Sequence, residues 1–280
     1  AEAGFTLSSK NPGIRNFWIE HVKRCRRITN HIGARQNSPS IHNLWIPDGF
    51  KDSPYDCWGH RAILKESLDE IYSESYAPET VKDALESKLF GIGSEAYVVG
   101  SHEFYMGYTF TRKKLICLDM GHFHPTESVA DKITAILQFS DELLMHISRG
   151  VRWDSDHVPV IDGNLRAVAE QITRYDLEKR VYLATDFFDG SINRVGAWTI
   201  GSRSLLKCLL AAMLEPSASL AKAEAKGDYF ARLALMEQTK SMPWGAVWNF
   251  YCMRHDVPLD HTIIAEISGY ENDVLRNRKS

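Results

Sequence analysis

Short apolar runs alternate with longer amphipathic stretches along the first two thirds of the chain, a pattern typical of strands alternating with helices. The first helix is expected from Asn11-Pro12 to about Gly33, because proline is tolerated at the first helical position. Strands are expected at 40–46, 85–90, 114–119, 143–148 and 181–186. Further helices are expected at 54–75 and 102–113, from Thr126 and Ser128 onwards, and after a cap at Asn164.

The remainder of the chain, from 194 to about 277, is expected to be almost wholly helical, with breaks near Pro216, Pro243 and Pro258. Strands that are apolar throughout and alternate with helices indicate a parallel sheet covered by helices, which is an α/β fold. Five strands do not close a (β/α) barrel, which needs eight. The sheet is therefore either open and doubly wound, or three strands lie upstream of Ala1.

Composition narrows the class of protein. The 280 residues are 44% hydrophobic, enough for one large domain or two small ones. The 33 basic and 36 acidic residues leave a formal charge of −3, without long runs of one sign, which argues against nucleic acid or a membrane surface as a partner. The basic cluster Lys23, Arg24, Arg26 and Arg27 is expected to be the solvated end of the first helix.

The cysteines and the longest apolar stretch bear on location. The five cysteines are odd in number and scattered, which indicates reduced thiols in a cytoplasmic protein. The stretch from Leu205 to Leu214 is too short to span a bilayer and contains Lys207, and no signal peptide is apparent.

Metal-ligand residue types recur at the ends of the expected strands. Parallel strands deliver such side chains to one edge of a sheet, and so many carboxylates there require cations to neutralise them. Carboxylate and imidazole ligands suit Mn, Zn, Co or Mg, and seven ligands are too many for one ion, so two neighbouring metals are expected, with Asp119 between them. The candidate ligands are Glu86, Asp119, His146 and Asp186 at strand ends, and His122, Asp154 and Asp156 in the following loops.

Each of these signals alone has an ordinary structural explanation. The D-x-D of Asp154 and Asp156 is usually a surface loop, His146 inside an apolar strand is usually a core histidine, and Glu86 and Lys88 could form a simple ion pair. The recurrence at one level of successive strands favours a site. In such a site Lys88 could neutralise negative charge on a substrate oxygen, whereas Trp45 is equally compatible with a sugar contact and with the core.

Several segments, in order along almost the whole chain, resemble the L-rhamnose isomerase family. The segments are Trp45-Ile-Pro-Asp-Gly, Glu86-Ser-Lys-Leu-Phe-Gly-Ile-Gly, Leu118-Asp-Met-Gly-His-Phe-His-Pro-Thr-Glu127, Arg152-Trp-Asp-Ser-Asp-His157 and Asp186-Phe-Phe-Asp. The resemblance implies a (β/α)8 TIM barrel of xylose-isomerase type and a homotetramer. It also implies interconversion of L-rhamnose and L-rhamnulose with Mn²⁺ or a similar divalent ion, two per chain.

The resemblance also assigns roles to individual residues. It implies that Glu86, Asp119, His146 and Asp186 hold a structural metal, and that His122, Asp154 and Asp156 hold a catalytic one. Lys88 would contact the substrate near its carbonyl end, and Trp45 and His122 would line the sugar pocket. Lys88, Asp154 and Asp156 are the expected catalytic residues.

The chain departs from the family in lacking the N-terminal barrel strands. Residues 1–193 would then form a partial barrel with the metal site, and 194–280 a helical extension with oligomer contacts. Such a piece would expose an apolar sheet edge and is expected to be unstable alone. Two alternatives remain at this point: an inactive fragment that needs its missing N-terminal part, and a metal-dependent hydrolase, against which the lack of a basic phosphate-binding surface argues.

Overall fold

The computed structural model describes residues 4–88, 96–152 and 155–278. The chain forms two compact units. The first comprises Ala1–His146, Gly150–Asp156 and Arg180–Ala184, and the second comprises Ile147–Arg149, His157–Lys179 and Thr185–Ser280.

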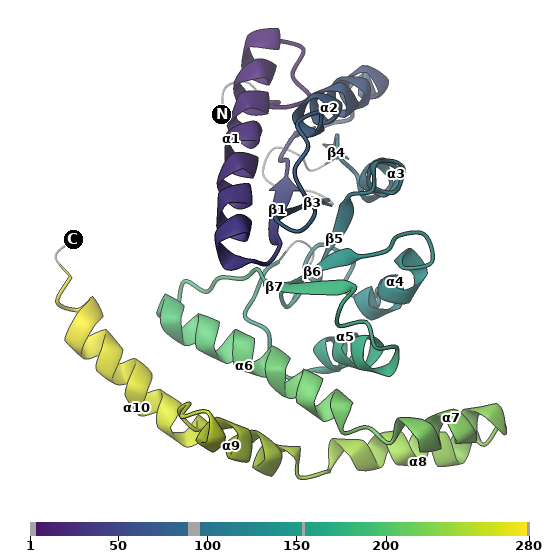
Figure 1. Cartoon of the computed structure of the whole chain (residues 1–280), viewed down its shortest axis with the longest axis vertical. Coiled ribbons are helices and arrows are strands. Elements are labelled where there is room, and N and C mark those ends of the chain that lie inside the picture. Colours follow the sequence, from purple (N-terminus) through teal and green to yellow (C-terminus); the bar gives the residue numbers. More distant parts are fainter. Residues whose placement is uncertain (1–3, 89–95, 153–154, 279–280) are drawn as a thin grey trace. The chain divides into compact units, whose positions relative to one another are not determined.

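The first unit is built on a five-stranded sheet with the strand order β1-β3-β5-β6-β7 (Figure 1). The pairs β1–β3, β3–β5 and β5–β6 are parallel, which confirms the predicted α/β class. The strands are β1 (Ser40–Trp45), β3 (Val81–Glu86), β5 (Leu115–Asp119), β6 (Leu143–Ile147) and β7 (Val181–Thr185), and a small antiparallel pair joins β2 (Gly49–Phe50) to β4 (Tyr97–Val98).

Four helices of the first unit follow the predicted order. Helix α1 begins at Pro12, as predicted, and the side chain of Asn11 caps it by accepting a hydrogen bond from the Gly13 N–H at 2.9 Å. Asn37, in the left-handed conformation at φ 51°, ends it. The helices are α1 (Pro12–Gln36), α2 (Cys57–Tyr72), α3 (His102–Arg112) and α4 (Val129–Ile136).

The two faces of the sheet have different neighbours, because side chains alternate along each strand. On one face Asp83 of β3 meets Arg26 of α1. The opposite face carries three sets of side chains along the direction of the strands. Lys82 and Tyr182 contact Glu142 near the N-terminal ends of the strands, an apolar cluster lies in the middle, and acidic and histidine side chains lie at the C-terminal ends. The apolar cluster consists of Ala84, Leu115, Cys117 and Leu144, with Ile41, Tyr182 and Ala184 packed against it.

Arg26 corrects the expectation of a solvated basic cluster. Its side chain is 1% exposed and donates to both oxygens of Asp83, at 2.8 and 2.9 Å. Its remaining Nη1 donates to the carbonyls of Ile71 and Glu74, each at 2.8 Å. Arg24 and Arg27 are exposed as expected. Helical periodicity turns Arg26 inward, beside the buried Ile19 and Val22, and Asp83 compensates its charge.

The second expected strand is also displaced. It was placed at 85–90, whereas β3 runs from Val81 to Glu86, and residues 89–90 lie outside the described part of the chain. The start of the strand is not apparent in the sequence, because the charged Lys82 and Asp83 interrupt the apolar run. Both pair with partners distant in sequence, Glu142 and Arg26, so their burial is compensated.

The second unit is mainly helical. Its helices are α5 (Gly163–Arg174), α6 (Arg194–Met213), α7 (Ser217–Ala225), α8 (Tyr229–Lys240), α9 (Trp244–Arg254) and α10 (Asp260–Tyr270), followed by the π-helix η1 (Glu271–Leu275). The breaks near Pro216, Pro243 and Pro258 are confirmed, and a further break at Gly227, with φ 69°, was not predicted. The cap of α5 is Asp162 rather than Asn164, with Oδ1 accepting from the Leu165 N–H at 2.9 Å.

Among the described residues, no single helix is both long and apolar enough to cross a membrane. The bent pair α6 and α7, which meet at 58°, reaches that length and composition only when the two are taken together.

Candidate metal centre

Three parallel strands bring acidic and histidine side chains together at their C-terminal ends. Glu86 is the last residue of β3, Asp119 is the last of β5, and His146 of β6 is directly opposite Asp119 in the register. Glu86 pairs in the same way with Cys117, two residues before Asp119, so their side chains share a face. Glu86, Asp119 and His146 are 3%, 1% and 8% exposed. The sequence-based prediction that these strand ends converge is confirmed for these three residues.

Glu86, Asp119 and His146 form a first group of potential metal ligands. One ligand atom from each lies within 4.8 Å of the others. His146 Nδ1 lies 3.3 Å from Glu86 Oε2 and 3.5 Å from Asp119 Oδ2. Two carboxylates and an imidazole around one point are a donor set that divalent cations such as Mn²⁺ or Zn²⁺ accept.

Asp119, His122 and Asp156 form a second group, again with ligand atoms within 4.8 Å of one another. A tight turn returns His122 to the site, since Gly121 N–H donates to Asp119 Oδ1 at 2.7 Å and His122 N–H donates to the Asp119 carbonyl at 3.3 Å. His122 Nε2 then lies 3.5 Å from Asp156 Oδ1. Asp119 belongs to both groups.

The hydrogen-bond partner of Ser155 explains how Asp156 reaches this group. The backbone N–H of Ser155 donates to the carbonyl of Gly121 at 3.3 Å, which holds the loop after β6 against the turn after β5. On the other side of His122, Nδ1 lies 3.0 Å from the carbonyl oxygen of Ser87 and 3.3 Å from Glu86 Oε1. His122 therefore connects the two groups.

The electrostatics of the cluster show an excess of buried negative charge. Burial opposes protonation of His122, but the hydrogen bond to Asp156 and the charges of Asp119 and Glu86 outweigh it and raise its pKa to about 9. Burial, reinforced by Asp156 and Glu86, also raises the pKa of Asp119. Both shifts favour bound positive charge at this position. The residues therefore fit a divalent cation.

Cys117 approaches the first group but differs chemically. Its sulfur lies within 4.8 Å of ligand atoms of Glu86 and His146. Burial raises the pKa of the thiol to about 12, so it remains protonated at neutral pH. The thiolate is the form that binds metals, so the carboxylate and imidazole groups remain the better ligands.

Lys88 and Trp45 lie together near the same strand ends. Lys88 Nζ is 5.1 Å from the centre of the Trp45 ring, within the range of a cation–π contact. Trp45 is the last residue of β1, directly opposite Glu86 in the register, and is 40% exposed. A cation and an aromatic face thus flank the carboxylates.

Two predicted ligands, Asp154 and Asp186, require separate comment. Asp154 lies outside the described residues. Asp186 directly follows β7 and is assigned to the second compact unit, where its N–H donates to the Ile147 carbonyl at 3.3 Å. Its role as a ligand stays a prediction. Asn43 was missed by sequence reasoning, although its side-chain amide donates to Glu86 Oε2. Its position two residues before Trp45 on β1 was the available signal.

Residues 1–278 match the family model described as L-rhamnose isomerase (RhaA). The chain is 52% identical over 278 residues to the L-rhamnose isomerase of Rhodopirellula baltica, covering 99% of the chain and 65% of that protein. It is also 52% identical over 275 residues to the L-rhamnose isomerase of Escherichia coli (strain K12), covering 98% of the chain and 66% of that protein. It thus spans slightly less than two thirds of the length of these curated relatives.

Among solved structures, a D-psicose 3-epimerase from Clostridium cellulolyticum matches at a TM-score of 0.44 and 14% identity, over 75% of the chain and 73% of that structure, too weakly to support an argument. The match to the family model over nearly the whole chain is the finding that classifies the protein. The chain belongs to the L-rhamnose isomerase family.

Proposed function

We propose that the chain forms the larger part of a metal-dependent aldose–ketose isomerase that interconverts L-rhamnose and L-rhamnulose. Membership of the family supports the substrate and the reaction. The observation that carries the proposal is the convergence of Glu86, Asp119 and His146 with His122 and Asp156 at one edge of the sheet. This arrangement supplies the carboxylate and imidazole ligands that such a reaction needs.

The proposed metal ligands follow the two groups. Glu86, Asp119 and His146 would hold one ion together with Asp186, and His122 and Asp156 would hold a second together with Asp154. Mn²⁺ is the proposed ion, with Zn²⁺, Co²⁺ or Mg²⁺ as candidates at one site. When bound, such ions polarise a carbonyl group as Lewis acids and orient the oxygens of the sugar.

The chain's own residues would bind the sugar and move a proton. Lys88, held over Trp45, would donate a hydrogen bond to the oxygen at the carbonyl end of the open-chain sugar, where negative charge develops. The exposed face of Trp45 would cover the apolar C–H surface of the sugar. Asp156 or Asp154 would take the proton of the O2 hydroxyl and return a proton to O1 as a hydrogen moves from C2 to C1.

The proposed complete fold is a (β/α)8 barrel in which the described sheet supplies five strands. β1 is an edge strand, and a hollow of about 1030 Å³ lies beside it. Apolar and aromatic side chains contribute to the lining of this hollow, among them Phe5, Trp18, Leu44 and Phe50. Further strands from the remaining third of the polypeptide, as judged from its relatives, would cover this edge. Residues 1–193 would then be the barrel part and 194–280 its helical extension.

The helical extension would provide the contacts of a homotetramer. Several large apolar side chains on its helices are exposed, as expected of a surface that is covered in an assembly. They include Met213, Phe230, Leu233, Phe250, Met253 and Ile264. The scattered cysteines support a cytoplasmic enzyme, and the net charge of −3 argues against nucleic acid or a membrane surface as a partner.

The proposal is tested by measuring L-rhamnulose formation from L-rhamnose with the full-length protein that contains this chain. Removal of metal with EDTA should abolish turnover, and Mn²⁺ should restore it. The double variant Glu86→Gln/His146→Ala should remain inactive after Mn²⁺ is returned. Turnover that is insensitive to EDTA, or metal-dependent hydrolysis of a nitrophenyl phosphodiester without isomerisation, would contradict the proposal.

A further inference from the structure

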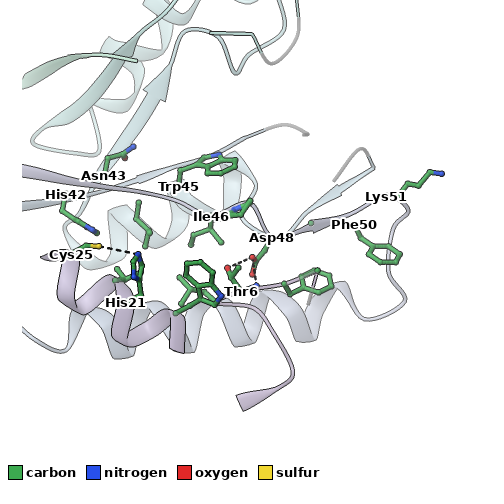
Figure 2. A pocket seen from close by; sticks show the side chains of 18 residues that line it. Thr6, His21, Cys25, His42, Asn43, Trp45, Ile46, Asp48, Phe50 and Lys51 are labelled. Atoms are coloured by element: carbon green, nitrogen blue, oxygen red, sulfur yellow. Dashed lines mark hydrogen bonds between the residues drawn. The ribbon is translucent and has the colours of Figure 1, made fainter. Parts of the chain in front are cut away.

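Asn43 is the polar side chain through which the edge strand β1 contacts the cluster. Its amide Nδ2 donates a short hydrogen bond to Oε2 of Glu86. Asn43 pairs in the register with Ala84, two residues before Glu86, so its side chain lies on the face of the sheet that carries Glu86. In Figure 2, Asn43 and Trp45 lie on one side of β1 and His42 and Ile46 on the other.

The chemistry of Glu86 determines the orientation of the amide. Oε2 of Glu86 accepts the hydrogen bond, so the NH₂ group of Asn43, and not its oxygen, faces the carboxylate. In this orientation Asn43 Oδ1 is buried and has no hydrogen-bond partner among the described residues. A buried acceptor without a partner is unfavourable, so the bond to Glu86 must be the interaction that holds the side chain in place.

The other neighbours of Glu86 show why the hydrogen bond from Asn43 matters for the orientation of the carboxylate. Oε2 also faces His146 Nδ1 at 3.3 Å, and Oε1 faces His122 Nδ1 at 3.3 Å. His146 is a candidate ligand of the same ion as Glu86, so its direct contact with Oε2 would be replaced when a cation binds between them. Asn43, in contrast, contacts Oε2 from β1 through a hydrogen bond that its amide donates. It can therefore fix the carboxylate in both states.

We infer that Asn43 is a positioning residue, which orients the Glu86 carboxylate for the cation held with Asp119 and His146. The inference rests on the proposed function, because it assumes that this group binds a divalent metal. Outer hydrogen-bond partners of ligating carboxylates commonly contribute about 10–100-fold to metal affinity. The inference also assigns a function to the edge strand β1: it places Asn43 against Glu86, so its correct pairing with β3 contributes to metal affinity.

The test is a Mn²⁺ titration of the metal-free, full-length protein followed by electron paramagnetic resonance. Asn43→Leu removes both polar atoms at similar volume, and Asn16→Leu makes the same change at an exposed position of α1. We expect Asn43→Leu to weaken one of the two binding steps about 10–100-fold and to leave the other within about threefold. Asn16→Leu should change neither step.

The outcomes separate the inference from the proposed function. A folded Asn43→Leu protein with unchanged Mn²⁺ affinity, or with both steps weakened equally, overturns the positioning role, whereas the wild type still binds metal. If Asn43→Leu does not fold, Asn43→Ser is judged by the same criterion. A wild-type protein that binds no divalent metal overturns the proposed function, and the inference with it.

Discussion

His122 Nε2 and Asp156 Oδ1 face each other at 3.5 Å, and this contact joins the loop after β5 to the loop after β6. The second loop is positioned by the backbone, through the hydrogen bond from Ser155 to Gly121. The ligand groups are thus brought together by the fold of the first unit, and burial of their charge makes a bound cation favourable. The site follows from the strand register, from the turn after β5 and from the loop after β6 that is bound to this turn.

Asp83→Asn should destabilise the first unit strongly. The change removes the negative charge that compensates the buried Arg26, whose side chain is 1% exposed. The same carboxylate also accepts a hydrogen bond from Lys114 Nζ at 2.8 Å. Breaking a buried ion pair by removing one partner typically costs about 3–5 kcal/mol. Urea unfolding of the full-length protein measures the loss. Glu20→Gln, which breaks a more exposed contact with Lys23 on α1, should cost less than about 1 kcal/mol, and an equal cost for both variants would refute the distinction.

Asp69 should make stability depend on acid pH. Burial disfavours its ionised form, but hydrogen bonds from Arg112, Lys65 and Tyr108 lower its pKa from 3.8 to about 2. A lowered folded-state pKa stabilises the protein above the unfolded value, and this contribution is lost as pH falls from about 4 to 2.

The variant Asp69→Asn should therefore be less stable than the wild type at pH 7, by about 1 kcal/mol because the carboxylate is partly exposed. The difference should shrink between pH 4 and pH 2 in urea unfolding curves. Asp52→Asn, at an exposed position, serves as the control and should change little. A difference between Asp69→Asn and the wild type that stays constant across this range would contradict the assignment.

Lys88→Met should impair catalysis without removing metal. Loss of a donor that stabilises negative charge on a reacting oxygen commonly lowers kcat about 10²–10³-fold. The measurement combines kcat for L-rhamnose with the Mn²⁺ content of the same preparation. Lys222→Met, at an exposed position of α7, should behave as the wild type. A kcat for Lys88→Met equal to that of the wild type would contradict a catalytic role for Lys88.

Much of the first unit could be predicted because local pattern and strand order agree. The run 114–119 and the run 143–148 are apolar, and their parallel pairing places Asp119 opposite His146. The alternation of strands with helices was enough to predict the α/β class. For these elements the periodicity of the side chains reflects the burial that the fold imposes.

The remaining features depend on partners distant in sequence. Arg26 and Asp83 are charged residues whose burial is possible only because they meet each other, so neither segment alone indicates it. Asn43 carries no motif, and its importance arises from the register that places it beside Glu86. The expected start of β3 was wrong for the same reason, since Lys82 and Asp83 look like solvent-exposed residues until their partners are known.

The most direct test of the central claim is the amount of metal bound per chain. The full-length protein, saturated with Mn²⁺ and desalted, is analysed for metal alongside the double variant His122→Ala/Asp156→Ala. Two converging ligand groups predict about two ions per chain in the wild type and about one in the double variant. A wild-type content near zero, or a variant content equal to that of the wild type, would contradict the claim that these side chains form a metal centre.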